Sequence, residues 1–214
     1  MVEDWNRLPR VDVSGRPDQW LKLVSAYFVP GSEQVDCFIA LARSGVEVAV
    51  LTNALEATDV PAVHAGYAKR RKPLLEAGVS LFEMNRSSAD LPAPRVRSPS
   101  GGSSGTSLHA KTFSMDGVRI FFIGSFNFDP RSARLNTELG FVIDSPTLAQ
   151  AIGDTFSSRM PAQACQVRLS ADGSLRWIEQ VAGREVVHEV EPGSRFWTRP
   201  GVSLLSTLPI EWLL

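Results

Sequence analysis

The 214-residue sequence lacks most of the features that mark a metal-binding, secreted or membrane-spanning protein. Its two cysteines, Cys37 and Cys165, lie far apart without the close spacing of a zinc site, and the three histidines form no cluster with them. No apolar run approaches the roughly 18 residues that suggest a membrane-spanning helix. The first residues, MVEDWNR, lack the apolar segment of a signal peptide. We therefore expect no metal or other cofactor, and a cytoplasmic protein that can also bind peripherally to the inner face of the cell membrane.

The sequence also lacks an excess of either charge, with a formal net charge of −1. Nucleic-acid-binding domains usually carry a basic stripe, so a nucleic acid is not an expected partner. Two local basic clusters remain, residues 69–72 (KRRK) and the arginines Arg86, Arg95 and Arg97. Such runs usually form a solvated helix face or loop. The 43% hydrophobic and 21% charged composition is ordinary for a soluble globular protein.

Apolar segments with the lengths of strands and helices alternate along the chain. We expect strands over 21–29, 46–52, 79–84, 108–115, 118–123 and 138–143, and helices over 32–43, 59–77 and 146–158. This order is typical of an α/β fold in which helices flank a largely parallel or mixed sheet. We expect a leader or linker remnant over 1–18, a main domain over 19–160 and a small β-rich C-terminal appendage over 161–214.

One short stretch concentrates residues suited to breaking a phosphodiester bond without a metal. His109 and Lys111 are two residues apart in an expected strand and should point to the same face. An imidazole there can attack phosphorus, and a neighbouring lysine can bind the anion and offset the charge of the transition state. Asp116 completes the pattern H-x-K-x-x-x-x-D, but it lies in an Asp116-Gly117 hairpin turn, where we expect a mainly structural role.

Polar residues that could support this histidine follow directly in the sequence. Ser125 and Asn127 come after the next expected strand and can donate hydrogen bonds to phosphoryl oxygens. Glu138 opens a further strand and is suited to accept a hydrogen bond from His109 Nδ1, which would leave Nε2 facing phosphorus. A surface turn and a surface carboxylate are the alternative roles for these three residues.

The motifs H-x-K-x4-D at 109–116, G-S-x-N at 124–127 and N-x-E at 136–138 together resemble the phospholipase D superfamily. Further segments, among them 27–31 (YFVPG), 51–53 (LTN), 64–67 (HAGY) and 209–214 (PIEWLL), resemble the second half of bacterial cardiolipin synthases of the C type. The resemblance implies an α/β fold with a seven-stranded mixed sheet and a two-step mechanism through a phosphohistidine. It also implies a site whose catalytic residues are His109, Lys111, Asp116 and Glu138. The phosphate-binding residues of this site would be Lys111, Ser125 and Asn127. His64 and Tyr67 are candidates to line a substrate pocket or, alternatively, to pack at the start of a helix.

The resemblance also implies two H-x-K-x4-D copies that meet at one pseudo-twofold site, one histidine attacking and the other protonating the leaving alkoxide. This sequence contains one copy. General acid catalysis typically contributes ~10²–10⁴ in rate, so we expect a second half, supplied by homodimerisation or by a complementary chain. The leading hypothesis is phosphatidyl transfer on a phosphatidylglycerol-like phospholipid. The alternatives are a homodimeric phosphodiesterase or nuclease and an inactive half-enzyme fragment that binds a partner or lipid.

Overall fold

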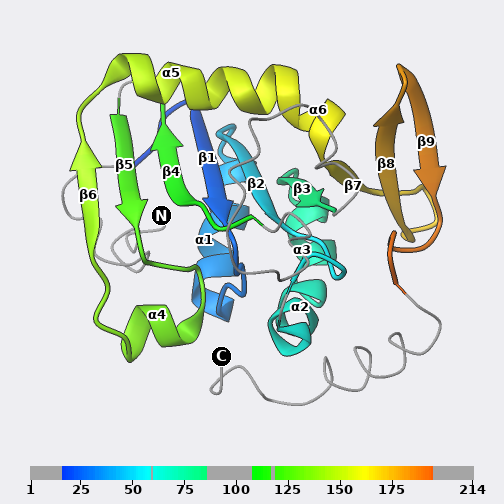
Figure 1. The fold of residues 1–214 in the computed structure, drawn as a ribbon, viewed down its shortest axis with the longest axis horizontal. Helices are drawn as coiled ribbons and strands as arrows, with labels where there is room; N and C mark the ends of the chain where they lie inside the picture. The colour runs from blue at the N-terminus through cyan, green and yellow to red at the C-terminus, as the bar shows by residue number, and fades with distance from the viewer. Residues whose placement is uncertain (1–15, 59, 86–107, 117–118, 195–214) are drawn as a thin grey trace, which may run out of the picture.

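The computed structural model describes residues 16–58, 60–85, 108–116 and 119–194, which form one mixed β-sheet flanked by helices (Figure 1). Nine strands follow the order β6-β5-β4-β1-β2-β3-β7-β8-β9 in this part of the chain. The strands are β1 (Trp20–Ser25), β2 (Glu47–Asn53), β3 (Ser80–Met84), β4 (Lys111–Met115), β5 (Arg119–Gly124), β6 (Gly140–Ile143), β7 (Cys165–Leu169), β8 (Leu175–Val181) and β9 (Arg184–His188). The helices are α1 (Ser32–Arg43), α2 (Pro61–Ala68), α3 (Arg71–Glu76), α4 (Pro130–Arg134), α5 (Pro146–Asp154) and α6 (Met160–Gln163), with a π-helical turn (Thr155–Arg159) between the last two.

The three central strands are parallel and the strands on both sides of them are antiparallel. β1 pairs with β2 and β2 with β3 in parallel. β4, β5 and β6 continue from β1 on one side, and β7, β8 and β9 continue from β3 on the other. The predicted α/β class with a mixed sheet is therefore confirmed, although the described residues form nine strands where the resemblance implied seven.

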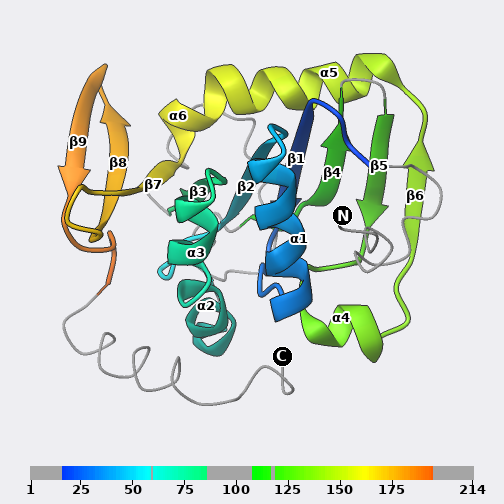
Figure 2. The same cartoon turned by 180° about the vertical axis from the view of Figure 1, so that it is seen from behind.

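The core lies on both faces of the central strands, which explains the four consecutive apolar residues 48–51 (VAVL) of β2. Val48 and Val50 pack on one face with residues of α1 and α3, whereas Ala49 and Leu51 pack on the other with Phe156 of the π-helical turn. Figures 1 and 2 show α1, α2 and α3 on one face of the sheet and α5 and α6 along its opposite side. A strand that is buried on both faces needs apolar residues at consecutive positions. No helix of the described residues is long and apolar enough to cross a membrane.

The C-terminal strands belong to the same sheet as the rest. β7 pairs with β3 through Phe82 and Gln166, and Val167 and Trp177 are part of the core that contains β1 and β2. The antiparallel β region predicted after residue 160 is thus present but packs as an extension of the main sheet. Residues 1–15 and 195–214 lie outside the described part, so the proposed domain limits stay predictions.

Three predicted elements differ from the observed ones in ways that affect the site. The predicted helix over 59–77 is two helices, α2 and α3. The fourth strand begins at Lys111, later than predicted, because the Asn53 side chain bonds the Leu108 backbone: Leu108 N–H donates to Asn53 Oδ1 (2.9 Å) and Asn53 Nδ2 donates to Leu108 O (3.1 Å). The sixth strand begins at Gly140. His109 and Glu138 therefore precede their strands, and the expectation that His109 and Lys111 alternate within one strand is wrong.

Candidate active site

Apart from Asp116, the motif residues lie at one end of the sheet because β4 begins there, β5 ends there and β6 begins there. Lys111 begins β4 and lies opposite Ser25 of β1. Gly124 ends β5 and pairs with Gly140, which begins β6. The start of β4, the end of β5 and the start of β6 therefore lie at the same end of the sheet (Figure 1). Chain segments far apart in sequence are brought together by the strand pairing alone.

The His109 side chain is exposed at this end. Its position follows from the residue before it, since Leu108 is held through its backbone by Asn53 at the end of β2. Asn53 is buried and its Nδ2 also donates to Ala26 O (3.1 Å). The imidazole is thus carried by a fixed backbone while its ring faces solvent, which is the arrangement a nucleophile needs.

Glu138 is held by two neighbours, Ser125, which was predicted to bind phosphate, and Asn136, for which no role was predicted. Ser125 Oγ donates to Glu138 Oε2, and Asn136 Nδ2 donates to Oε1 (3.1 Å). Within the described residues Glu138 has no hydrogen bond to His109, so the predicted orienting contact is not formed in this state. Partial burial raises the pKa of Glu138, but the hydrogen bonds from Ser125 and Asn136 and the positive charge of Lys111 outweigh burial and hold it below its ordinary value.

Ser125 is itself fixed by the backbone of the next strand. Its N–H donates to Leu139 O (2.9 Å), and its Oγ accepts from Leu139 N–H (3.0 Å). Because the hydroxyl proton is committed to Glu138, Ser125 acts here as a support for the carboxylate. Its predicted role as a phosphate donor stays a prediction that requires this bond to open.

Asn127 is positioned by the aromatic residues on both sides of it. Phe126 and Phe128 are buried in the core, and Val29 N–H donates to Phe128 O (2.7 Å), so the chain alternates between core and site here. Asn127 N–H donates to Ser132 Oγ (3.3 Å). Its Oδ1 is buried without a hydrogen-bond partner among the described residues. Such an atom costs ~1–3 kcal/mol, which is expected of a group that awaits a ligand.

The loop after Asn127 is anchored by a helix cap. Asp129 accepts from Ser132 N–H (2.8 Å) at the start of α4, and Ser132 Oγ donates to the same carboxylate (3.3 Å). Burial raises the pKa of Asp129 against the effect of the Ser132 hydrogen bonds. Ser132 thus fixes the loop that follows Asn127.

Asp116 lies at the opposite end of β4 from Lys111. The two are five residues apart, about 17 Å along an extended strand. The Asp116 carboxylate accepts hydrogen bonds from the backbone N–H groups of Asp18, Gln19 and Trp20, each at 2.8 Å. Its φ of 51° fits the tight turn. Asp116 therefore holds the beginning of β1, in line with the structural role expected for it and away from the other motif residues.

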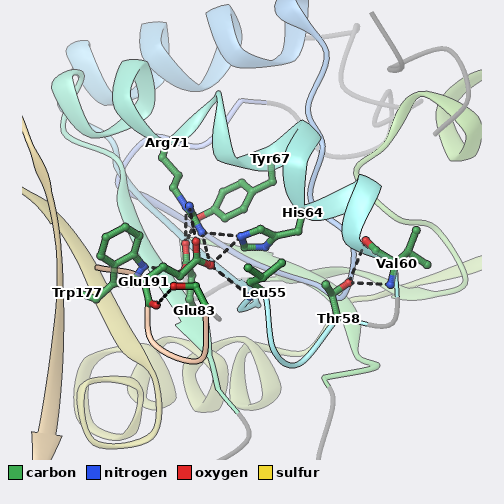
Figure 3. A network of polar contacts seen from close by, with 10 residues as sticks. Leu55, Thr58, Val60, His64, Tyr67, Arg71, Glu83, Trp177 and Glu191 are labelled. Carbon is green, nitrogen blue, oxygen red and sulfur yellow. Dashed lines mark hydrogen bonds and ion pairs between the residues drawn. The ribbon is translucent and has the colours of Figure 1, made fainter. Parts of the chain in front are cut away.

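His64 and Tyr67 lie in a buried polar network (Figure 3). His64 Nε2 is 2.7 Å from Glu191 Oε1, and Tyr67 OH donates to Glu83 Oε1 (2.9 Å). Arg71 joins both carboxylates, with Nε 2.7 Å from Glu83 Oε1 and Nη2 2.9 Å from Glu191 Oε1. This placement favours packing over the predicted pocket-lining role, which stays a prediction.

The network contains residues that sequence reasoning missed. Arg71 is 3% exposed, so the interpretation of residues 69–72 as a solvated basic run is wrong at this position. Trp177 Nε1 donates to Glu83 Oε2 (2.9 Å). Burial alone would raise the pKa of Glu191, but the Arg71 charge and the His64 hydrogen bond lower it to about 2. The one available sequence signal was Glu83, a charge inside an otherwise apolar strand.

Nothing in the described part of the chain resembles a metal site: no group of three or more His, Cys, Asp or Glu side chains could hold an ion there. What the motif end offers is an exposed histidine, a half-buried lysine, an amide with an unsatisfied oxygen and a carboxylate whose pKa is lowered. These groups suit nucleophilic attack on a phosphate ester.

Comparisons with known proteins identify a family and several relatives. The family described as "Cardiolipin synthase, PLD-like domain" matches residues 17–160. Cardiolipin synthase C of Escherichia coli K12 is 47% identical over 203 residues, which are 95% of this chain and 42% of that protein. Cardiolipin synthase B of the same strain is 27% identical over 68% of this chain and 30% of its own length. The chain thus spans less than half the length of these relatives.

A solved structure is similar in fold. The phospholipase D family member Nuc from Salmonella typhimurium superposes with a TM-score of 0.51 at 19% identity, covering 71% of this chain and 84% of Nuc. At that identity the likeness concerns the arrangement of strands and helices.

Proposed function

Because the chain belongs to the family of phospholipase D-like domains of cardiolipin synthases, we propose that it forms one catalytic half of a phosphatidyltransferase acting on phospholipids. The proposal is supported by the common end of β4, β5 and β6, to which the exposed His109, Lys111, Asn127 and Glu138 all belong. The 47% identity to cardiolipin synthase C along nearly the whole chain supports the lipid substrate.

The reaction begins with attack by His109 on the phosphorus of a phosphatidylglycerol-like lipid. The Nε2 lone pair forms the N–P bond while the P–O bond to the headgroup glycerol breaks, and that oxygen takes a proton. Lys111 binds the phosphoryl oxygens and offsets the charge that gathers on them. Glu138, kept ionised by its neighbours, favours the positive charge of the imidazole in the phosphohistidine.

The second step returns the histidine to its free state. The hydroxyl of an acceptor lipid attacks phosphorus, loses its proton to a base and displaces Nε2 as the N–P bond breaks. Phosphatidylglycerol as both donor and acceptor yields cardiolipin and glycerol. Water in place of the acceptor yields phosphatidic acid.

The leaving glycerol oxygen also needs a proton donor. We assign it to a second H-x-K-x4-D half, consistent with the relatives' greater length. The substrate also requires the assembled protein to meet a membrane surface, at least peripherally.

The test is cardiolipin formation in phosphatidylglycerol vesicles by this chain coexpressed with the part of E. coli cardiolipin synthase C that the match leaves uncovered. Cardiolipin should form, and His109→Ala should abolish both it and the acid-labile phosphohistidine that can be trapped from labelled lipid. His188→Ala, which replaces a histidine at the other end of the sheet, should retain both. Absence of cardiolipin with the second half present would refute the proposal. Turnover of bis-p-nitrophenyl phosphate by the chain alone would instead favour a homodimeric phosphodiesterase.

A further inference from the structure

His109 lies on a short connection between two fixed points of the backbone. On one side Lys111, the first residue of β4, pairs with Ser25 of β1. On the other side Leu108 bonds the Asn53 side chain through its N–H (2.9 Å) and through its carbonyl oxygen (3.1 Å). His109 and the residue after it lie between these points, and both are exposed. The position of the histidine therefore depends on strand pairing on one side and on Asn53 on the other.

The place of Asn53 in the sheet suits it to hold the chain. It is the last residue of β2, pairs with Met84 of β3 and is 4% exposed. Its side chain lies on the same face as Leu51, two residues earlier, and the Leu108 side chain packs against the apolar cluster to which Leu51 belongs. Because the Asn53 backbone is part of the central sheet, its amide is a fixed point for the chain that leads to His109.

The hydrogen bonds of Asn53 require both ends of a carboxamide. Oδ1 accepts from Leu108 N–H, whereas Nδ2 donates to Leu108 O and to Ala26 O. An ionised aspartate could keep the first bond but has no proton for the other two, and a leucine could form none of them. Substitutions at this position can therefore remove the contacts with Leu108 in two steps.

A second buried asparagine lies in a similar place but contacts another part of the chain. Asn85 directly follows β3, which pairs with β2, and it is 2% exposed. Its Nδ2 donates to Glu179 Oε1 (3.2 Å) of β8 and to Cys165 Sγ (3.5 Å) of β7. Asn85 thus links the parallel strands to the C-terminal strands, whereas Asn53 links them to the residue before the nucleophile. The pair offers a matched comparison within one molecule.

We propose that Asn53 is a positioning residue for phosphatidyl transfer, which sets the attack geometry of His109 through the Leu108 backbone. The inference rests on the proposed function and adds a residue outside the H-x-K-x4-D motif on which the rate depends. A displacement of about 1 Å at a reacting group can lower a rate about 10²-fold. Lys111 keeps its place in the strand ladder when Asn53 is replaced. Loss of Asn53 should therefore lower kcat and leave KM nearly unchanged.

The experiment compares Asn53→Leu, Asn53→Asp and Asn85→Leu in this chain coexpressed with the part of E. coli cardiolipin synthase C that the match leaves uncovered. Well below the lowest melting temperature, Asn53→Leu should lower kcat for cardiolipin formation about 10²-fold and change KM for phosphatidylglycerol less than about twofold. Asn53→Asp, which keeps one bond to Leu108, should have an intermediate kcat. Asn85→Leu should lose comparable stability but change kcat less than about twofold.

Two further measurements separate a displaced histidine from a general loss of structure. The Leu108 amide should exchange its hydrogen at least about tenfold faster in Asn53→Leu, because its acceptor is gone, and at an unchanged rate in Asn85→Leu. Modification of His109 by diethyl pyrocarbonate, followed by mass spectrometry, should be equally fast in all variants, since His109 is exposed. A slow enzyme with an equally reactive histidine indicates misplacement of the ring.

Several results would overturn the proposal. They are an equal loss of kcat in Asn53→Leu and Asn85→Leu, a loss carried by KM alone, and unchanged turnover or unchanged Leu108 exchange in Asn53→Leu. If Asn53→Leu does not fold, the same comparisons are made with Asn53→Asp. If the unsubstituted assembly makes no cardiolipin, the proposed function fails, whereas faster Leu108 exchange in Asn53→Leu but not in Asn85→Leu would still support the hold of Asn53 on the motif.

Discussion

Two polar clusters of this protein use the same kinds of side chain in opposite ways. At the motif end, His109 is exposed, Asn127 keeps an unsatisfied oxygen, and Glu138 is held by small neutral neighbours. Beneath α2 and α3, His64, Arg71 and the two carboxylates are enclosed and bonded to one another (Figure 3). A cluster that binds a substrate keeps polar groups free to contact it, whereas a cluster that stabilises the fold uses its polar groups in internal hydrogen bonds and ion pairs. Substitutions at the motif end should therefore lower catalysis, whereas substitutions in the interior cluster should lower stability.

The largest effect is expected from His109→Ala. Loss of the nucleophile should lower phosphatidyl transfer by the assembled enzyme at least about 10³-fold. Because the ring is exposed, the free energy of unfolding should change by no more than a surface substitution causes, within about 0.5 kcal/mol. Radiolabelled transfer assays and urea titrations measure the two quantities. Substantial destabilisation would mean that His109 is a structural residue like those of the interior network.

Arg71→Met should instead lower the stability of the fold. Removing the guanidinium leaves Glu83 and Glu191 without their cation, and breaking a buried ion pair from one side typically costs ~3–5 kcal/mol of unfolding free energy. Lys72→Met removes the same charge from the neighbouring exposed position and should change stability little. Equal stability of the two variants in urea would show that the interior network contributes nothing to the fold.

The interior network should also make stability depend on acid pH. The pKa of Glu191 is lowered to about 2 in the folded protein, below its ordinary value of 4.5. A lowered pKa stabilises the folded state above the unfolded-state value, and this contribution is lost as the pH falls from about 4.5 toward 2. We expect a loss of up to about 3 kcal/mol across this window, and a shallower dependence in Glu191→Gln. Thermal melts at half-unit pH intervals measure it, and identical profiles would contradict the assignment.

The smallest effect is expected at Asp116. Asp116→Ala removes the acceptor of three backbone hydrogen bonds at the start of β1 and should cost ~2 kcal/mol of stability. Because the residue lies about 17 Å from Lys111, transfer by the folded fraction should fall less than about threefold. Asp36→Ala on the exposed side of α1 is the control. A large loss of transfer at unchanged stability would place Asp116 in the chemistry after all.

Much of the fold could be predicted because its signals are local. The nearly continuous apolar character of residues 46–52 identified the central strand β2, and the helix predicted over 32–43 agrees with the observed bounds of α1. The Asp116-Gly117 pair indicated the hairpin between β4 and β5. These features depend on neighbouring residues, so the sequence alone contains them.

The contacts that were missed join residues far apart in sequence. Glu191 and Arg71 are 120 positions apart, and the residues around them give no sign that the two side chains pair. The start of β4 was misplaced because Asn53 bonds Leu108 from 55 positions away. Ser125 and Glu138 were both recognised, but their mutual hydrogen bond was not, since spacing does not determine which partner a hydroxyl chooses.

The link between Asn53 and Leu108 has a consequence for how the chain can evolve. Two hydrogen bonds between the Asn53 side-chain amide and the Leu108 backbone hold the chain just before the nucleophile at the end of the central strand β2. The imidazole therefore takes its position from the most deeply embedded part of the sheet. We therefore expect related proteins to tolerate changes in the length and composition of residues 86–107 without a change in the position of His109.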